Sequence, residues 1–207
     1  MSLTEKEVIP YWQDRVDKSG EAAVGFDAKN ISAQNGRYHE RKIFINSFLY
    51  KELITLDYGC GIGRYSDLFE KDKYVGVDIM LDLIHHASKN NPEKSYIHLP
   101  TPYLPDESIS TKYVEQIFTA TVLQHNSAEM IEKIFKSFYN GIASKKIRFV
   151  LYEKNEYKQP NKPHVQNIGI TTLTSVIGNA GYNVDKIECH NHYIHNENHT
   201  LNIITTM

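Results

Sequence analysis

Glycines alternate with other residues between two aspartates in the segment ITLDYGCGIGRYSDLFEKDKYVGVD. The three glycines, Gly59, Gly61 and Gly63, leave one loop bare of side chains, so a ligand can touch its backbone. Asp57 lies two residues before the first glycine, and Asp78 follows about 20 residues later. This spacing predicts a site that holds a small ligand through main-chain groups and two carboxylates.

Two classes of ligand use such loops. Dinucleotides use the pattern G-x-G-x-x-G, which is tolerable here when it is read from Gly61 to Ser66. Charge favours the other class, because a carboxylate repels a pyrophosphate by about 1–4 kcal/mol at about 4 Å. Asp57 instead attracts a ligand with a sulfonium and an ammonium group, such as S-adenosylmethionine. Asp78 suits both classes, since an acid at this spacing can accept both ribose hydroxyls.

Three segments carry a resemblance to a known family. LDYGCGIGRYS and VGVDIM resemble the first two motifs of class I S-adenosylmethionine-dependent methyltransferases, and EQIFTATVLQHN resembles the fourth motif. The resemblance covers the chain from about Leu53 to Met207, and its most specific part is the D-x-G-C-G-x-G loop. It implies an α/β fold with a doubly wound, mostly parallel seven-stranded sheet in the order 3-2-1-4-5-7-6, whose strand seven is antiparallel.

The same resemblance implies S-adenosyl-L-methionine as the cofactor. The glycine loop would hold its methionyl part, with Asp57 near the amino group, and Asp78 would hold the ribose. The aspartate that usually follows the third strand, near the adenine amine, is missing here. Leu99 and Thr101 are the nearest candidates for that contact. The predicted cofactor residues are Asp57, Gly59, Cys60, Gly61, Gly63, Asp78, Ile79, Met80, Leu99, Thr101, Thr119 and Thr121, and the last two should lie near the methyl group.

Two residues are candidates for catalysis. Methyl transfer needs alignment, and it needs a base where the accepting atom carries a proton. His125 follows the fourth strand, and a neutral imidazole can take such a proton near pH 7. Glu153 ends the fifth strand and could bind or deprotonate the acceptor. Each has a structural alternative, since His125 could brace its loop and Glu153 could brace a helix.

Candidates for acceptor binding lie before the sheet. Arg37 and Arg41 are one helical turn apart, and either could bind the cofactor carboxylate or an acidic acceptor. Tyr11 and Tyr38 could line the acceptor pocket. A solvated helix face for the arginines and simple packing for the tyrosines are the alternatives.

The segment KNEYKQPNKPHVQNIG, after the fifth strand, is long for a strand–helix connection. It could cover the acceptor site with Tyr157 and His164, or it could be a solvated excursion. Further along, His190 and His192 would share one face of a strand. They lack a nearby cysteine or acid at metal-ligand spacing, so we expect a polar, exposed loop and no metal site.

The elements that must position these residues alternate between strands and helices. Strand patterns at 52–59, 73–79, 95–99, 114–121 and 146–153 are separated by helical patterns at 63–72, 80–91 and 127–143, the last with Ser127 as its cap. This order predicts a parallel sheet with helices on both faces. A short helix stopped at Gly181 and two consecutive strands, 183–189 and 200–205, predict an antiparallel hairpin at the edge.

We divide the chain into residues 1–50, a helical cap or lid, and residues 51–207, the S-adenosylmethionine-binding core, within one structural domain. The 207 residues carry a formal charge of −2, which argues against a nucleic-acid partner. Two distant cysteines and no long apolar run predict a cytoplasmic protein with no membrane contact. We expect a monomer or homodimer.

These features predict an enzyme that methylates a small-molecule or sugar acceptor, with oxygen favoured over nitrogen as the accepting atom. Two alternatives remain. One is a non-catalytic S-adenosylmethionine-binding partner subunit, and the other is an NAD(P)-dependent oxidoreductase, which Asp57 disfavours.

Overall fold

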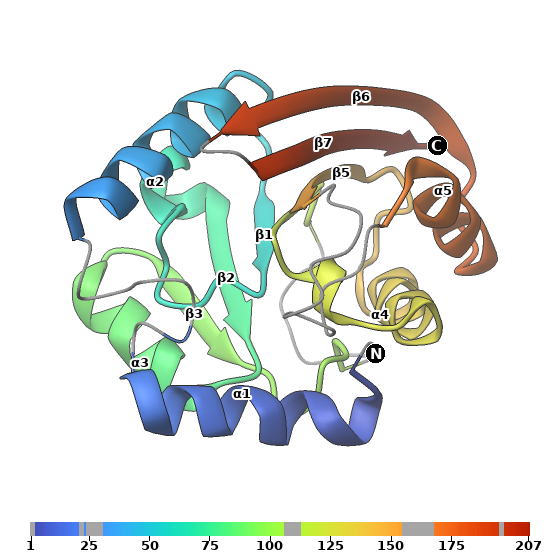
Figure 1. Cartoon of the computed structure of the whole chain (residues 1–207). Helices are drawn as coiled ribbons and strands as arrows, with labels where there is room; N and C mark the ends of the chain where they lie inside the picture. The colour runs from blue at the N-terminus through green and yellow to red at the C-terminus, as the bar shows by residue number, and fades with distance from the viewer. Residues whose placement is uncertain (1–2, 21–22, 24–30, 106–112, 155–167, 195–196) are drawn as a thin grey trace.

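A seven-stranded sheet forms the centre of the computed structural model, which describes residues 3–20, 23, 31–105, 113–154, 168–194 and 197–207 (Figure 1). Its order is β3-β2-β1-β4-β5-β7-β6, and only the pairs that involve β7 are antiparallel. The predicted strand order is therefore confirmed. The strands are β1 (Thr55–Tyr58), β2 (Tyr74–Asp78), β3 (Ser95–His98), β4 (Gln116–Ala120), β5 (Arg148–Lys154), β6 (Val184–Ile194) and β7 (Glu197–Thr206).

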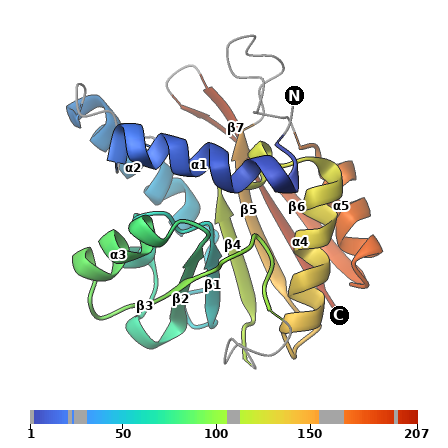
Figure 2. The same cartoon turned by 90° about the horizontal axis from the view of Figure 1, so that it is seen from below.

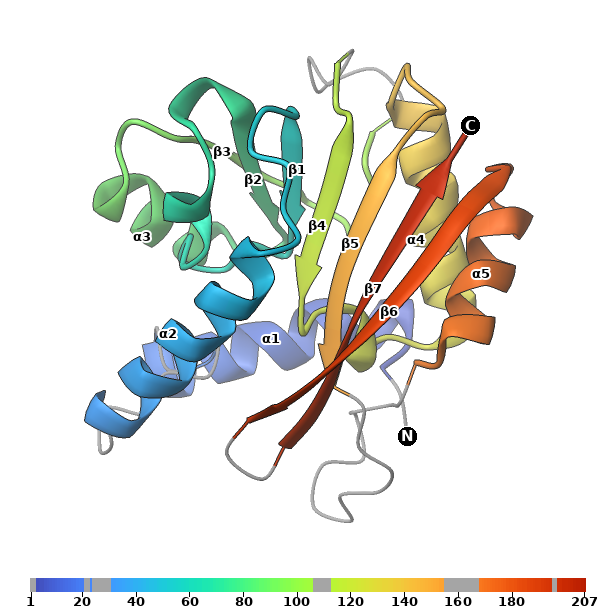
Figure 3. The ribbon, with the colours of Figure 1, turned by 90° about the horizontal axis from the view of Figure 1, so that it is seen from above.

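Helices cover both faces of this sheet (Figures 2 and 3). Successive residues of β5 alternate between the faces, so that Phe149 joins the core under α4 and α5 while Val150 joins the core under α2. No helix in the described part of the chain has the length and apolar character needed to cross a membrane. The α-helices are α1 (Glu5–Ser19), α2 (Ile31–Asn46), α3 (Leu81–Asn90), α4 (Ala128–Gly141) and α5 (Ile170–Asn179).

The first helix crosses the carboxyl ends of the central strands (Figure 2). A capping box starts it, in which the backbone N–H of Thr4 donates to the Glu7 carboxylate at 2.9 Å. Val8 is buried in the main core, and Leu3 pairs with Asn126 in the loop after β4. The helix is thereby fixed over the edge of the sheet where the strands end. The predicted cap of α4 is also present, since the Ser127 hydroxyl accepts from the N–H of Met130.

The segment after the glycine loop differs from its prediction. Two short 3₁₀ turns, η3 (Ser66–Leu68) and η4 (Lys71–Lys73), stand where residues 63–72 predicted an α-helix. Tyr65 packs edge-on against Phe118 of the sheet, and Phe69 packs against Tyr74. Phe69 adopts an extended backbone to reach this position. Burial of the Tyr65 and Phe69 rings therefore accounts for the two short 3₁₀ turns in place of a continuous α-helix.

The terminal hairpin is longer than its sequence pattern predicted. Strands β6 and β7 extend through most of the expected polar loop at residues 190–199. The ring of His192 stacks on Phe44 of α2 at 4.1 Å between centroids, and His190 lies 4.2 Å from Phe48. The prediction of an exposed loop was wrong here, because α2 supplies an aromatic surface for these histidines.

Candidate functional site

A cavity of about 560 Å³ opens at the carboxyl ends of β1, β2, β4 and β5, against α1 and α2. This volume falls within the range of about 300–1,000 Å³ that is typical of small-ligand sites. In doubly wound sheets, ligands bind at this edge. The predicted residues that line the cavity are Tyr11, Arg37, Tyr38, Arg41, Asp57, Gly59, Cys60, Gly61, Asp78, Ile79, Met80, Leu99, Thr121 and His125.

The glycine loop forms one wall of this cavity. Gly59 has φ 75° and Gly61 has φ 55°, a left-handed conformation that favours glycine. A Cβ at position 59 would lie 2.5 Å from a methyl group of Val122, so the loop after β4 approaches too closely for any side chain. Gly63 does not line the cavity. Its missing side chain instead makes room for the hydroxyl of Tyr96, which would lie 2.5 Å from a Cβ.

Asp57 lies at the end of β1 and is only 2% exposed. Its carboxyl Oδ2 accepts a hydrogen bond from the Tyr74 hydroxyl at 2.8 Å. The pKa of Asp57 is raised to about 7, mainly by burial and in smaller part by the nearby Asp78, while the Tyr74 hydrogen bond opposes the shift. A cationic ligand group beside Asp57 would stabilise its ionised form.

Asp78 ends β2 and fixes the glycine loop. Its Oδ2 accepts from the N–H of Gly61 and its Oδ1 from the N–H of Met80, each at 2.9 Å. Burial raises its pKa, and these two N–H groups and that of Ile79 oppose the shift. Each carboxylate oxygen can accept a second hydrogen bond, as two vicinal hydroxyls would require.

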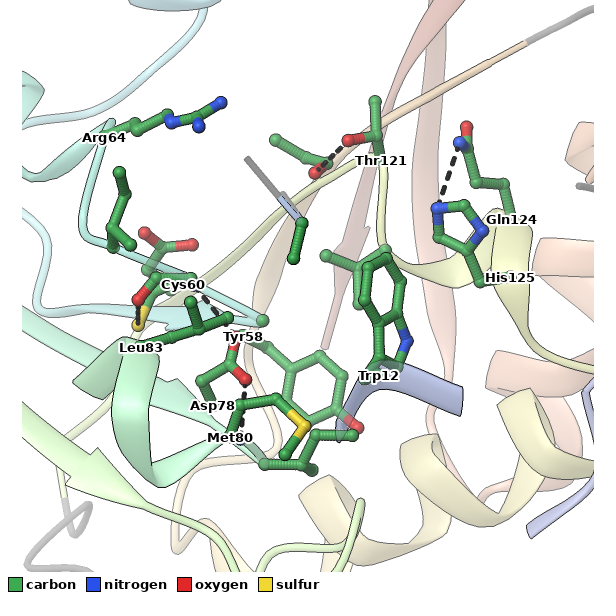
Figure 4. A pocket seen from close by; sticks show the side chains of 18 of the residues that line it. Trp12, Tyr58, Cys60, Arg64, Asp78, Met80, Leu83, Thr121, Gln124 and His125 are labelled. Atoms are coloured by element: carbon green, nitrogen blue, oxygen red, sulfur yellow. Dashed lines mark hydrogen bonds between the residues drawn. The ribbon is translucent and has the colours of Figure 1, made fainter. Parts of the chain in front are cut away.

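Apolar side chains surround Asp78. Met80 and Leu99 are buried, and the N–H of Leu99 donates to the Asp78 carbonyl at 2.8 Å. Figure 4 places Met80 and Tyr58 beside Asp78. These residues can seat a flat ring next to a hydroxylated group. We call this region the acidic side; it comprises Asp57, Gly59, Gly61, Asp78, Ile79, Met80 and Leu99.

His125 reaches the cavity from the 3₁₀ turn η5 (Leu123–His125), just after β4. Its ring packs edge-on against Trp12 of α1 at 5.2 Å between centroids. The side-chain amide of Gln124 lies 3.4 Å from His125 Nε2 (Figure 4). The ring is therefore held in place at the cavity wall.

Basic and aromatic side chains from α2, the residue after the glycine motif, β5 and β7 also line the cavity. Figure 4 shows Arg64 and Thr121 at the top of the view, well separated from Met80 at the bottom. We call this region the cationic wall. It comprises Arg37, Tyr38 and Arg41 of α2, Arg64 after the glycine loop, Lys154 at the end of β5 and His199 of β7.

Solved structures share this fold. The chain superposes on magnesium protoporphyrin IX methyltransferase from Synechocystis PCC 6803, crystallised with bound S-adenosylmethionine, with a TM-score of 0.62 and 13% identity over 98% of both chains. A TehB-like methyltransferase from Corynebacterium glutamicum gives 0.58 and 16% over 96% of this chain and 100% of that one. A methyltransferase from Archaeoglobus fulgidus gives 0.62 and 14% over 87% and 100%. No protein-family model and no curated protein matches the sequence.

The chain has the fold of class I S-adenosylmethionine-dependent methyltransferases. At this level of identity the likeness is one of fold. The methyltransferase fold brings the ends of β1 and β2 together, which explains why two aspartates 21 residues apart in the chain face one cavity.

Glu153 lies behind the cavity and is 2% exposed. Its Oε1 accepts from the Thr119 hydroxyl at 2.9 Å and from the N–H of Leu123 at 3.2 Å, and Oε2 accepts from the N–H of Gln124. Burial raises its pKa to about 7, against these hydrogen bonds. The structure therefore supports the bracing alternative, in which Glu153 holds the loop that carries His125. It also places Thr119 on Glu153 rather than along the cavity.

One further predicted residue, Thr101, does not line the cavity. Thr101 is exposed and contacts the backbone of Tyr103. Tyr157 and His164 lie outside the described residues.

The sequence analysis did not select Arg64, Lys154 or His199 as site residues. Arg64 directly follows the glycine motif, which was a usable signal. Lys154 and His199 gave no local signal, because they meet only through the antiparallel pairing of β5 with β7. Thr121, which was selected, has φ 60°, a conformation that a β-branched residue rarely adopts.

Proposed function

We propose that the protein is an S-adenosylmethionine-dependent methyltransferase that acts on a small-molecule or sugar acceptor, with oxygen as the accepting atom. The observation that carries this proposal is the acidic side. Two buried carboxylates flank a bare glycine loop at the carboxyl ends of the strands. A structural neighbour from Synechocystis was crystallised with bound S-adenosylmethionine and also with bound S-adenosylhomocysteine.

The residues of the acidic side fit this cofactor. Asp78 would hold the ribose, because both of its oxygens keep capacity for hydroxyl donors. Asp57 would face the amino group, whose charge favours the ionised carboxylate. Met80, Ile79 and Leu99 would contact the adenine. When bound, S-adenosylmethionine supplies an electrophilic methyl carbon.

The residues of the chain would align the acceptor and manage its proton. His125 lines the cavity and would take the proton of the accepting hydroxyl. Glu153 would position it indirectly, by holding the backbone of the η5 turn. Tyr11 and Trp12 of α1 would exclude water from the reacting atoms.

The size and cover of the cavity support a small acceptor. About 560 Å³ beneath α1 suits a cofactor and a small molecule better than a segment of folded protein or duplex. The formal charge of −2 does not favour a nucleic-acid acceptor. We further propose a cytoplasmic monomer or homodimer, in keeping with two free cysteines.

Calorimetric titration with S-adenosylmethionine, S-adenosylhomocysteine and NAD⁺ tests the cofactor. Binding of the first two without NAD⁺ is the expected result, and NAD⁺ binding alone would instead indicate an oxidoreductase. Release of S-adenosylhomocysteine in the presence of a panel of hydroxylated small molecules then tests turnover. Cofactor binding with no turnover on any acceptor would favour a non-catalytic partner subunit.

A further inference from the structure

Gln124 of the η5 turn is anchored on β5 by both its main chain and its side chain. It is 5% exposed and lines the cavity. Its backbone N–H donates to the Glu153 carboxylate at 3.2 Å. Its side-chain Oε1 accepts from the backbone N–H of Lys154 at 2.8 Å. The Gln124 side chain is therefore held at a fixed place beside the His125 ring.

The bond from Lys154 determines which way round the Gln124 amide lies. A backbone N–H can only donate, so the amide oxygen must face it, and the NH₂ group takes the other position. That NH₂ nitrogen lies 3.4 Å from Nε2 of His125 (Figure 4). Because an amide NH₂ only donates, Nε2 of His125 must accept. A neutral imidazole carries its proton on one nitrogen, so the proton of His125 is on Nδ1.

The two nitrogens of the His125 ring differ in access to the cavity. Nδ1 is buried, in a ring that packs edge-on against Trp12. Nε2 lies on the side of Gln124, which lines the cavity. A ligand can therefore meet the ring at Nε2. The distance of 3.4 Å is long for a hydrogen bond, so an incoming hydroxyl can take the place of the amide.

We propose, on the basis of the function proposed above, that Gln124 is a positioning residue that holds His125 as the Nδ1–H tautomer and keeps the lone pair of Nε2 for the accepting hydroxyl. Nε2 takes the hydroxyl proton while Nδ1 keeps its own, so the ring becomes an imidazolium, and the proton on Nε2 later passes to water. An amide donor that faces Nε2 disfavours this charged ring. Gln124 thereby also helps to restore the neutral base.

The tautomer decides whether the ring can act as a base. With the proton on Nε2, the cavity would face an N–H donor, and the lone pair would be buried at Nδ1. The shape of the site would be the same, but no lone pair would meet the hydroxyl. A wrong tautomer should therefore lower kcat more than it changes KM.

The substitution Q124E separates the tautomer from the packing. Glutamate has the shape of glutamine, and one of its oxygens can still accept from the N–H of Lys154. The other oxygen replaces the NH₂ donor by an acceptor, which requires a proton on Nε2 of His125. Q13E is the matched control, since Gln13 is on α1 outside the cavity lining and bonds the exposed Asp17.

Nitrogen NMR of the ligand-free, isotope-labelled protein reads the tautomer directly, because a protonated ring nitrogen and one with a lone pair resonate far apart. Spectra are recorded at about pH 8, where an ordinary imidazole is neutral. The His125 signals are those lost in H125N. The wild type and Q13E should carry the proton on Nδ1, and Q124E should carry it on Nε2. A wild-type proton on Nε2, or an unchanged tautomer in folded Q124E, would overturn the proposal.

Turnover tests the part that Gln124 plays in the reaction. On an acceptor that the protein methylates, Q124E should lower kcat by about 10²-fold or more, while affinity for S-adenosylhomocysteine stays within about threefold of the wild type. Equal kcat in Q124E and the wild type would contradict the proposal.

The two readouts separate this proposal from the function on which it rests. Failure of the wild type to bind S-adenosylhomocysteine would refute the proposed function, whereas the spectra decide the tautomer without any cofactor. Normal S-adenosylhomocysteine binding with the wild-type proton on Nε2 would leave that function standing and refute only the role of Gln124.

Discussion

The acidic side and the cationic wall face the same cavity but are built from different kinds of structure. The acidic side comes from residues 57–99, where consecutive strands end beside one another. The wall comes from α2, one loop residue, the end of β5 and the start of β7, which are distant in the chain. Neighbouring strand ends place the first region, whereas packing between α2, one loop residue and the antiparallel pair β5 and β7 places the second.

This difference assigns a separate task to each side. The acidic side uses backbone N–H groups, two carboxylates and apolar side chains, which suit the cofactor proposed above. The wall uses long side chains from α2 and the hairpin, which suit a ligand particular to this protein. Substitutions on the acidic side should therefore change cofactor binding, and substitutions in the cationic wall should change acceptor binding.

The largest expected effect is a loss of turnover when His125, which lines the cavity, is replaced. H125A should lower kcat by about 10²–10⁴-fold, because the accepting hydroxyl loses its base. Its affinity for S-adenosylhomocysteine should stay within about threefold of the wild type. H85A serves as the control, since His85 is exposed on α3. Unchanged kcat in H125A would leave His125 only a structural role.

Replacing Asp78 should disable the acidic side alone. D78N should weaken S-adenosylhomocysteine binding about 100-fold, since an amide cannot accept from both Gly61 and Met80 and still receive two hydroxyls. Calorimetry measures the change, with D82N on the exposed start of α3 as the control. If D78N bound the product as tightly as the wild type, the ribose contact would be excluded.

Asp57 predicts a pH dependence of cofactor affinity. With its pKa raised to about 7, the carboxyl is protonated below that pH and attracts the amino group less. Affinity for S-adenosylmethionine should be constant above about pH 8 and fall up to about tenfold per pH unit below pH 6. D57N should bind more weakly with a flatter profile. A wild-type affinity that is flat from pH 5.5 to 8 would show that Asp57 does not meet the cofactor.

The same shift has a consequence for folding. Because the pKa of Asp57 is higher in the folded state than its ordinary value of 3.8, ionisation opposes folding. Its favourable contribution is complete below about pH 3.8 and is lost as the pH rises through about 7. In the absence of ligand, D57N should therefore gain stability relative to the wild type as the pH rises from 5 to 8, as measured by urea unfolding.

The smallest expected effect is on stability, when Glu153, which holds the η5 turn, is replaced. E153A should lower the free energy of unfolding by about 1–3 kcal/mol, because the Thr119 hydroxyl and the N–H groups of η5 lose their acceptor. E129A is the control, as Glu129 forms an exposed pair with Lys133. Unchanged stability with abolished turnover would instead place Glu153 among the reacting groups.

The sequence predicted the acidic side well, because its signals are local. Gly59 and Gly61 need left-handed backbone, and Asp57 and Asp78 lie next to strands that the apolar pattern identifies. The antiparallel edge followed from the same pattern, and the strand order followed from the resemblance.

The remaining features depend on contacts between distant segments. No periodic pattern in the sequence predicts the contact between Arg41 and His199, which lie 158 residues apart. The stacking of His192 on Phe44 likewise extended a hairpin that looked like a polar loop. The sequence left Glu153 as a candidate for catalysis, because its burial against the η5 turn arises only in the folded protein.

A crystal structure with bound S-adenosylhomocysteine tests the central claim most directly. The account predicts the ribose hydroxyls on the Asp78 carboxylate, the amino group facing Asp57, and the sulfur directed toward the space between His125 and the cationic wall. A ligand bound with its ribose away from Asp78, or with its amino group remote from Asp57, would contradict it.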